Sequence, residues 1–147
     1  MKEERIKAVK VAPGEKPEVV ELENNLDTLQ KTEYGVSESV VGHYGHFDTF
    51  AAHAVREAKK HHPKVMLTLL IPYYPYNNDT SGYDRTFYPP GMEDVLKPFA
   101  IVRANEYMIR TSNYLICYDR GQIGKTRDYV ELARQSENRG KLHIEFI

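Results

Sequence analysis

The sequence is poor in cysteine and carries almost no net charge. One cysteine in 147 residues excludes a disulfide framework within the chain and a cysteine-rich zinc module. Twenty Lys and Arg against twenty-one Asp and Glu give a formal net charge of -1, which excludes a nucleic-acid binder that relies on bulk positive charge. No apolar run approaches the roughly 20 residues of a membrane span, and the first residues lead into no signal-peptide core. We therefore expect a cytoplasmic protein with no membrane partner and no strong nucleic-acid binding.

What the sequence does hold is typical of a globular protein. Hydrophobic residues make up 41% and charged residues 28%, which is the composition of a chain that folds around a core. A length of 147 residues corresponds to one domain with a small appendage. Tryptophan is absent, but there are eleven tyrosines, and five of them fall between residues 73 and 88. This clustering indicates that the segment 73–88 has a function of its own.

The N-terminal part differs in pattern from the rest, so we expect two segments, 1–35 and 36–147. Apolar and charged residues alternate over 6–11, Pro and Gly then mark a turn, and a second strand-like run covers 18–22. This pattern predicts a β-hairpin, followed by a short helix over 26–31. A hairpin with one short helix is not stable alone, so we expect it to pack on the segment 36–147.

From residue 36 the chain alternates between strand-like and helix-like patterns. The expected strands are 36–41, 65–71, 114–118 and 142–147, and the expected helices are 49–61, 97–111 and 126–137. This alternation predicts an α/β fold, a three-layer Rossmannoid arrangement with a mostly parallel sheet. Ligands then bind beyond the carboxyl ends of the strands. The loops that leave those ends are 42–48, 72–91 and 119–125.

The first of these loops contains Gly42, Gly45 and Asp48 between a strand and a helix. Glycines here let the backbone approach a phosphate, and the helix N-terminus supplies N–H groups and a positive dipole. A tight strand–helix turn needs glycine in any case, so both interpretations stay open. Asp48 is most simply the helix N-cap, and alternatively it holds a ribose hydroxyl or acts in catalysis. His43 and His46 have no further ligands at metal-binding spacing, so we expect no metal site.

The last loop carries Gly121, Gly124, Lys125 and Thr126, again between a strand and a helix. This order is similar to a phosphate-binding P-loop, but Asp119 stands where that motif has its first glycine. Too little chain follows for a magnesium-binding strand, so we do not expect a nucleoside triphosphatase. A second anion-binding turn remains, with Lys125 and the neighbouring backbone N–H groups as donors.

The loop 72–91 is rich in tyrosine and proline. A loop of about 20 residues in a compact domain is usually functional. Tyr83 and Tyr88 can stack on a base, and Arg85 can reach a phosphate. A self-packed loop and a contact between subunits are equally open, because tyrosine is enriched at interfaces. Cys117 lies inside an expected strand and is predicted to be a core residue.

Taken together, these residues resemble a known family. The stretches VVGHYGHFDTFAAHAVREAKKHHPKVMLTLLIPYYP and YDRTFYPPGMEDVLKPFAIVRANEYMIRTSNYLICYDRGQIGKT resemble the YpsA-like (DUF1273-type) branch of the SLOG superfamily. These are Rossmannoid proteins related to the DNA-processing protein DprA/Smf and to the LOG cytokinin-activating hydrolases. The resemblance implies binding of a nucleotide or nucleotide-derived ligand at the glycine turns. Carried over by position, it implicates Gly42, Gly45, Asp48, Arg103, Asn105, Gly121, Gly124, Lys125 and Thr126.

The chain also departs from that family. His46 stands where the family usually has a second glycine, and its side chain hinders close approach of a phosphate. The family's first strand and helix are missing, and residues 5–34 in their place resemble DUF3846, a small domain of phage and mobile-element proteins. Because the missing strand is central in the full fold, we expect a gap or an exposed edge in the sheet. Either the hairpin or a second subunit fills it, and on this ground we predict a homodimer.

Three functions remain open at this point, so the sequence does not decide whether the protein is an enzyme. The first is a sensor or sponge that binds a nucleotide-like ligand without turnover and without a cofactor. The alternative is a nucleoside-phosphate N-glycosidic hydrolase or transferase, which needs a carboxylate near the anomeric carbon. The candidates for that carboxylate are Asp48, Asp84, Glu93 and Glu106. The third is a degenerate Rossmannoid fold that serves as an interaction scaffold.

Overall fold

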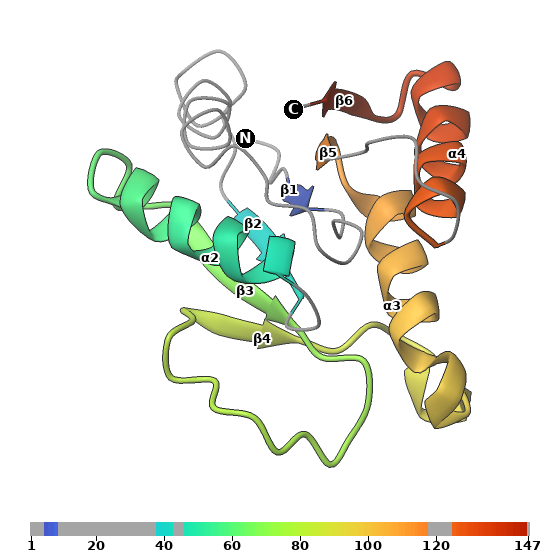
Figure 1. Ribbon diagram of the computed structural model, residues 1–147, viewed down its shortest axis with the longest axis horizontal. Helices are drawn as coiled ribbons and strands as arrows, with labels where there is room; N and C mark the ends of the chain where they lie inside the picture. The colour runs from blue at the N-terminus through green and yellow to red at the C-terminus, as the bar shows by residue number, and fades with distance from the viewer. Residues whose placement is uncertain (1–4, 9–37, 43–45, 118–124, 147) are drawn as a thin grey trace.

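The computed structural model describes residues 5–8, 38–42, 46–117 and 125–146. Within them, six strands form one sheet in the order β4-β3-β2-β1-β5-β6, and every neighbouring pair is parallel (Figure 1). The strands are β1 (Arg5–Ala8), β2 (Glu38–Val41), β3 (Met66–Leu70), β4 (Arg85–Phe87), β5 (Tyr114–Cys117) and β6 (His143–Phe146). The helices are α2 (His46–Lys59), α3 (Lys97–Thr111), α4 (Lys125–Asn138) and the short 3-10 helix η1 (Met92–Asp94). The predicted α/β fold with a parallel sheet is confirmed.

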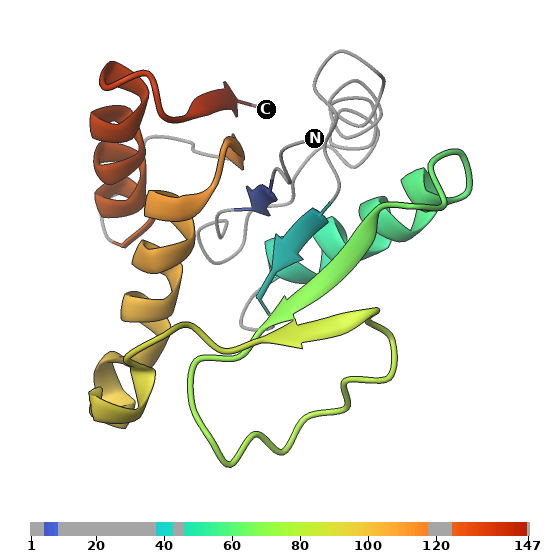
Figure 2. The same cartoon turned by 180° about the vertical axis from the view of Figure 1, so that it is seen from behind.

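The chain builds the sheet outwards from its centre. From β1 it passes to β2, β3 and β4 on one side, and then it crosses through α3 to β5 and β6 on the other. Figures 1 and 2 show α2 on one side of the sheet and α3 and α4 on the other, so the helices and the sheet form three layers. The strand order reverses between β1 and β5. In open α/β sheets, ligands bind at the carboxyl edge beside such a reversal.

The apolar pattern of each element matches the face that it buries. α2 buries Ala51, Ala54, Val55 and Ala58, which recur at the spacing of one helical face. In β3 the side chains of residues 67–70 are all buried, as expected for a strand that is covered on both faces. These two elements therefore have the environments that their sequences predict.

The side of α3 that faces the sheet carries small residues. Ala100 and Ala104 are fully buried, so the helix can lie close to the strands. They belong to a core cluster made of Val40, Leu70, Met92, Ala100, Ala104 and Met108. A second cluster joins α3 and α4 to β5 and β6. Because Leu70 is the last residue of β3, the first cluster fixes α3 over the carboxyl edge of the sheet.

The N-terminal hairpin predicted from the sequence is wrong for the residues that the structure describes. β1 pairs in parallel with β2 on one side and with β5 on the other, so neither of its edges can take an antiparallel partner. The alternating pattern correctly predicted a strand, but it does not say which strand is its partner. The rest of the expected hairpin and the short helix at 26–31 lie outside the described residues. The division of the chain at residue 35 stays a prediction.

β1 also changes the argument for a homodimer. The resemblance predicted that the central first strand is missing and that the sheet has a gap there. β1 occupies the place between β2 and β5, so the sheet is continuous at its centre. The predicted homodimer therefore loses the physical ground on which it was based and stays a prediction without that support.

Two local expectations are corrected as well. The segment 72–91 is not entirely loop, because Arg85–Phe87 forms the edge strand β4 beside β3. Three residues are too few to show a strand period in the sequence, so this strand had no signal of its own. α2 begins at His46, so Asp48 lies in its first turn and not at the N-cap position.

Candidate functional site

A small pocket opens at the carboxyl edge of the sheet, between the start of α2 and the middle of α3. It is open to solvent, and its volume is about 10 Å³, which is room for about one water molecule. Its lining residues come from the ends of β2 and β3 and from the two helices, and they are Gly42, Asp48, Leu70, Pro72, Ile101, Ala104 and Asn105. Three of the predicted site residues, Gly42, Asp48 and Asn105, are therefore brought together here.

Asp48 brings a carboxylate to this pocket although the residue is only 2% exposed. Its Oδ1 accepts a hydrogen bond from the backbone N–H of Gly42, with an N to O distance of 3.3 Å. A Cβ at position 42 would lie 3.0 Å from Asp48 Oδ2, so glycine is what allows this close approach. The first turn of a helix also favours a negative charge, because the helix dipole is positive there. The protein's own carboxylate thus lies at the helix end where the sequence suggested a phosphate.

Asn105 brings an amide to the pocket from α3. The residue is 8% exposed, and its Nδ2 lies 3.4 Å from the hydroxyl oxygen of Tyr129 on α4. Burial raises the pKa of the Tyr129 hydroxyl, and the hydrogen bond with Asn105 opposes this without outweighing it. The hydroxyl therefore keeps its proton at neutral pH and can both donate and accept hydrogen bonds. The sequence did not single out Tyr129, because a tyrosine on an amphipathic helix has no distinct functional signal.

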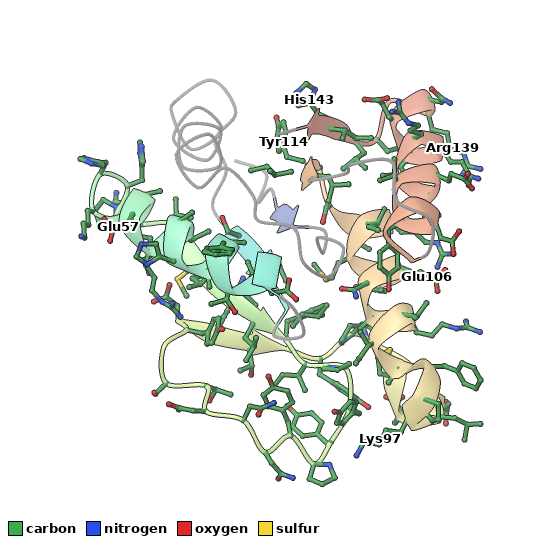
Figure 3. All side chains as sticks on the ribbon, viewed as in Figure 1. Glu57, Lys97, Glu106, Tyr114, Arg139 and His143 are labelled. Atoms are coloured by element: carbon green, nitrogen blue, oxygen red, sulfur yellow. The ribbon has the colours of Figure 1, made fainter. Side chains whose placement is uncertain are left out.

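Part of the tyrosine-rich segment packs on α3. Tyr88 is half-buried against the core cluster beneath α3, and its ring meets that of Tyr74 edge to face at 4.9 Å between centroids. Tyr74 is 60% exposed. Lys97 Nζ lies 4.7 Å from the ring centroid of Tyr73, and Figure 3 shows Lys97 where α3 begins, beside this segment. Tyr88 therefore contributes to packing, whereas Tyr74 presents an exposed ring.

The other end of the segment is fastened to α2. Arg56 donates hydrogen bonds from Nε and Nη2 to the carbonyl oxygen of Gly82, at 3.1 and 2.9 Å. The same guanidinium lies 5.1 Å from the ring centroid of Tyr83. One residue further along, Asp84 forms an ion pair with Lys59. Tyr83 is thus in contact with α2 and does not line the pocket.

Arg85 is held by the sheet. Its Nε lies 2.9 Å from Oε2 of Glu38, and its Nη2 contacts the same oxygen. Thr68 Oγ1 donates a hydrogen bond to that oxygen at 2.7 Å. The three side chains form a polar cluster that connects β2, β3 and β4, and the Glu38 carboxylate at its centre is only 3% exposed. That Arg85 reaches a phosphate stays a prediction, and its guanidinium is already engaged. Glu38 was not singled out, although a glutamate in a short apolar strand is a usable signal.

The remaining predicted site residues are Gly45, Arg103, Gly121, Gly124, Lys125 and Thr126. The three glycines lie outside the described residues. Arg103 is exposed on α3, and the last two residues begin α4. A role for the second glycine turn therefore stays a prediction. The apolar walls of the pocket were not predicted, because in a sequence such residues look like any other part of the core.

Two kinds of feature are absent from the described part of the chain. None of its helices has the length and apolar character needed to cross a bilayer. Nor do three His, Cys, Asp or Glu side chains gather there as a metal site requires. Comparison with known proteins gives no family either, since no family model matches the sequence and the search of curated proteins finds no significant match. The resemblance to the SLOG superfamily therefore stays an expectation.

Proposed function

We propose that this protein binds a nucleotide or nucleotide-derived ligand at the carboxyl edge of its sheet, as a sensor or sponge without turnover. The observation that carries this proposal is the pocket at that edge, in a parallel sheet whose strand order reverses between β1 and β5. Open α/β sheets bind nucleotides in the crevice outside the carboxyl ends of their strands. The pocket lies at the ends of β2 and β3, and β1 separates β2 from the reversal.

The lining of the pocket also supports ligand binding. Ligand sites combine apolar walls with a few placed polar groups. Here the walls include Leu70 and Ile101, and the polar groups are the Asp48 carboxylate and the Asn105 amide. Polar groups that are this strongly buried fix the orientation of a ligand, since they lose free energy when they are left without partners.

The start of α4 supplies the second element of the proposal. Parallel strands end at the same edge, so the expected glycine turn after β5 starts at the carboxyl edge, as the pocket does. α4 begins at Lys125, and a helix N-terminus attracts anions through its N–H groups and its dipole. We assign the phosphate of the ligand to this turn, with Gly121, Gly124, Lys125 and Thr126 as its proposed contacts.

An N-glycosidic hydrolase is the second candidate, and one observation favours it. Of the four carboxylates considered from the sequence, Asp48 lines the pocket. Asp84 instead pairs with Lys59, and Glu106 lies 3.8 Å from Arg110. An acidic side chain beside a bound nucleoside can act on the bond to the base. Chromatography of each bound nucleotide for released free base separates this candidate from a binding protein without turnover.

Calorimetry after a thermal-shift screen tests the proposed function. The panel holds the ribonucleoside mono-, di- and triphosphates, cyclic dinucleotides and ADP-ribose. We expect at least one compound to raise the melting temperature and to give a heat of binding. The proposal fails when no compound in the panel does either at millimolar concentration.

Substitution of Asn105 locates the site. Asn105→Leu keeps the size of the side chain and removes its polar atoms, so a bound ligand loses one hydrogen bond. We expect affinity to fall about tenfold, which corresponds to about 1.4 kcal/mol. Asn138→Leu, at the exposed end of α4, is the matched control and should bind as the wild type does. Equal affinities of both variants would place the ligand elsewhere.

A further inference from the structure

The outer side of α3 carries two large apolar side chains where the helix begins. Leu96, the N-cap residue, is 69% exposed, and Phe99 is 57% exposed. Because these two residues are three positions apart, they lie on the same side of the helix. The third large apolar side chain that is exposed in the described part of the chain is Tyr74, in the segment 72–91. Adjacent exposed apolar side chains such as Leu96 and Phe99 mark a surface on which another molecule packs.

The rest of α3 is covered by the protein itself. Ala100, Ala104 and Met108 are fully buried in the core cluster that reaches β2 and β3. The contact with α4 involves Asn105 and Ile109, which lie further along the helix. Figures 1 and 2 show the start of α3 at the edge of the molecule, with α4 beside the other half of the helix. The first turn of α3 is therefore open to a partner.

Opposite charges flank the two apolar side chains. Glu93 and Asp94, in η1, precede them and are exposed. Arg103 is exposed as well, and it lies four residues after Phe99 on the same side of α3. Neither these two carboxylates nor the guanidinium of Arg103 forms an ion pair within the described part of the chain. The surface thus has an acidic end, an apolar centre and a basic end.

We propose that the start of α3 is an interface between two copies of this chain, related by a two-fold axis near Phe99. In such an isologous contact, each copy presents the same surface to the other. Two antiparallel α3 helices that cross at Phe99 bring the apolar side chains together at the centre. The same arrangement places the acidic end of each copy beside Arg103 of the other copy, so that opposite charges meet on both sides of the axis.

The order of the charges is what favours a second copy as the partner. A partner with one sign of charge, such as an anionic lipid surface, would be repelled at one end of this surface. A second copy matches both ends at once. This ground for a homodimer depends neither on a gap in the sheet nor on the proposed function. The contact is small, since it involves little more than one helical turn from each copy, so we expect a weak dimer.

Sedimentation velocity of the full chain tests the proposal, at protein concentrations from about 5 µM to about 1 mM. We expect the mass to rise toward that of two chains and to go no further. Phe99→Ser removes the apolar centre at an exposed position, and it should raise the dissociation constant at least about tenfold. Tyr74→Ser removes a similarly exposed ring elsewhere and should associate as the wild type does. A wild type that stays monomeric, a mass beyond two chains, or equal association of Phe99→Ser and the wild type overturns the proposal.

Charge reversal tests the pairing of the two ends. The two variants are Arg103→Glu and Glu93→Lys combined with Asp94→Lys. Each variant alone brings like charges together on both sides of the axis, so it should associate about tenfold more weakly than the wild type. In an equimolar mixture, opposite charges meet again on both sides, so mixed dimers should form with about the wild-type affinity. Sedimentation of the mixture, with one variant fluorescently labelled, measures this.

Mixed association that is no stronger than that of each variant alone overturns the two-fold arrangement. All three substituted positions are exposed, so we expect the variants to fold. Their melting temperatures, measured at a protein concentration at which the chain is monomeric, verify this separately from association. Asp94→Lys alone replaces the double variant if the latter does not fold.

Discussion

Two buried carboxylates stand at opposite ends of one short strand, and their surroundings differ. Glu38, the first residue of β2, is 3% exposed, and Asp48, in the first turn of the helix that follows that strand, is 2% exposed. The side chains of Thr68 on β3 and Arg85 on β4 bind the Glu38 carboxylate. Asp48 receives a backbone N–H from Gly42 and borders an open pocket. A buried charge needs partners, and these two carboxylates obtain them in different ways.

The comparison separates a structural role from a binding role. Glu38 and its partners lie within the sheet and connect three strands. The hydrogen bonds and the ion pair among them therefore contribute to the free energy of folding. Asp48 lies at the carboxyl edge, where α/β proteins bind ligands, and it lines the pocket there. We therefore expect substitutions around Glu38 to change stability and substitutions around Asp48 to change affinity.

The largest effect that the comparison predicts is on stability. Arg85→Met leaves the Glu38 carboxylate buried without its cation, and loss of one partner from a buried pair costs about 3–5 kcal/mol. Because the Arg85 side chain is 44% exposed, solvent screens part of that interaction, so we expect a loss of about 2 kcal/mol in the free energy of unfolding. Urea unfolding measures it.

Two further variants show whether that loss comes from the ion pair. Glu38→Gln combined with Arg85→Met should be more stable than Arg85→Met alone, because the uncompensated charge is then gone. Arg103→Met, at an exposed position of α3, should stay within about 0.5 kcal/mol of the wild type. Equal stability of Arg85→Met and Arg103→Met would mean that the cluster contributes little.

A change of intermediate size is expected at the pocket. In Gly42→Ala the new Cβ would lie 3.0 Å from Asp48 Oδ2, so the carboxylate must move. We expect affinity for the ligand to fall about tenfold, with a loss of about 1 kcal/mol in stability for the weakened hydrogen bond. Gly82→Ala is the matched control, since its Cβ meets only the flexible end of Arg56, at 2.8 Å. Wild-type affinity in Gly42→Ala would separate Asp48 from the binding site.

The sequence predicted those parts of the fold that depend on local patterns. The helix at 97–111 has the predicted bounds, because a proline in its first turn and a long amphipathic period mark it clearly. The apolar run predicted a buried strand at 65–71, and β3 covers Met66–Leu70. The partners of β1 were not, since pairing with β2 and β5 joins residues more than thirty positions apart, and no local pattern records that.

The same limit applies to the candidate site. Gly42 and Asp48 were predicted because a strand, a glycine turn and a helix follow one another in the sequence. Asn105 came from the family resemblance alone. The bond between Arg85 and Glu38 spans 47 positions, so Arg85 looked like a free cation in a loop. Interactions between residues that are far apart in the sequence become apparent only in the folded structure.

The smallest expected effect concerns a third carboxylate, Asp84. Like Glu38 it has a cationic partner, and like Asp48 it accepts a backbone N–H. Asp84 is about one-third exposed, accepts the backbone N–H of Leu67 at 2.7 Å and pairs with Lys59. Partial burial acts to raise the pKa of Asp84, but these two partners outweigh it and hold that pKa below its ordinary value. A lowered pKa in the folded state stabilises the protein above the unfolded value of about 3.9, and this contribution disappears as the pH falls through the folded pKa.

Asp84→Asn should therefore reduce the free energy of unfolding by no more than about 1 kcal/mol at pH 7, since the pair is near the surface. The difference between variant and wild type should shrink below about pH 4. Lys59→Met, which keeps the carboxylate and the bond from Leu67, should show part of the same pH dependence. Urea unfolding at pH 7, 5, 4 and 3 measures both. A difference that stays constant across this range would mean that Asp84 acts through packing of the segment and not through its charge, unlike Glu38 and Asp48.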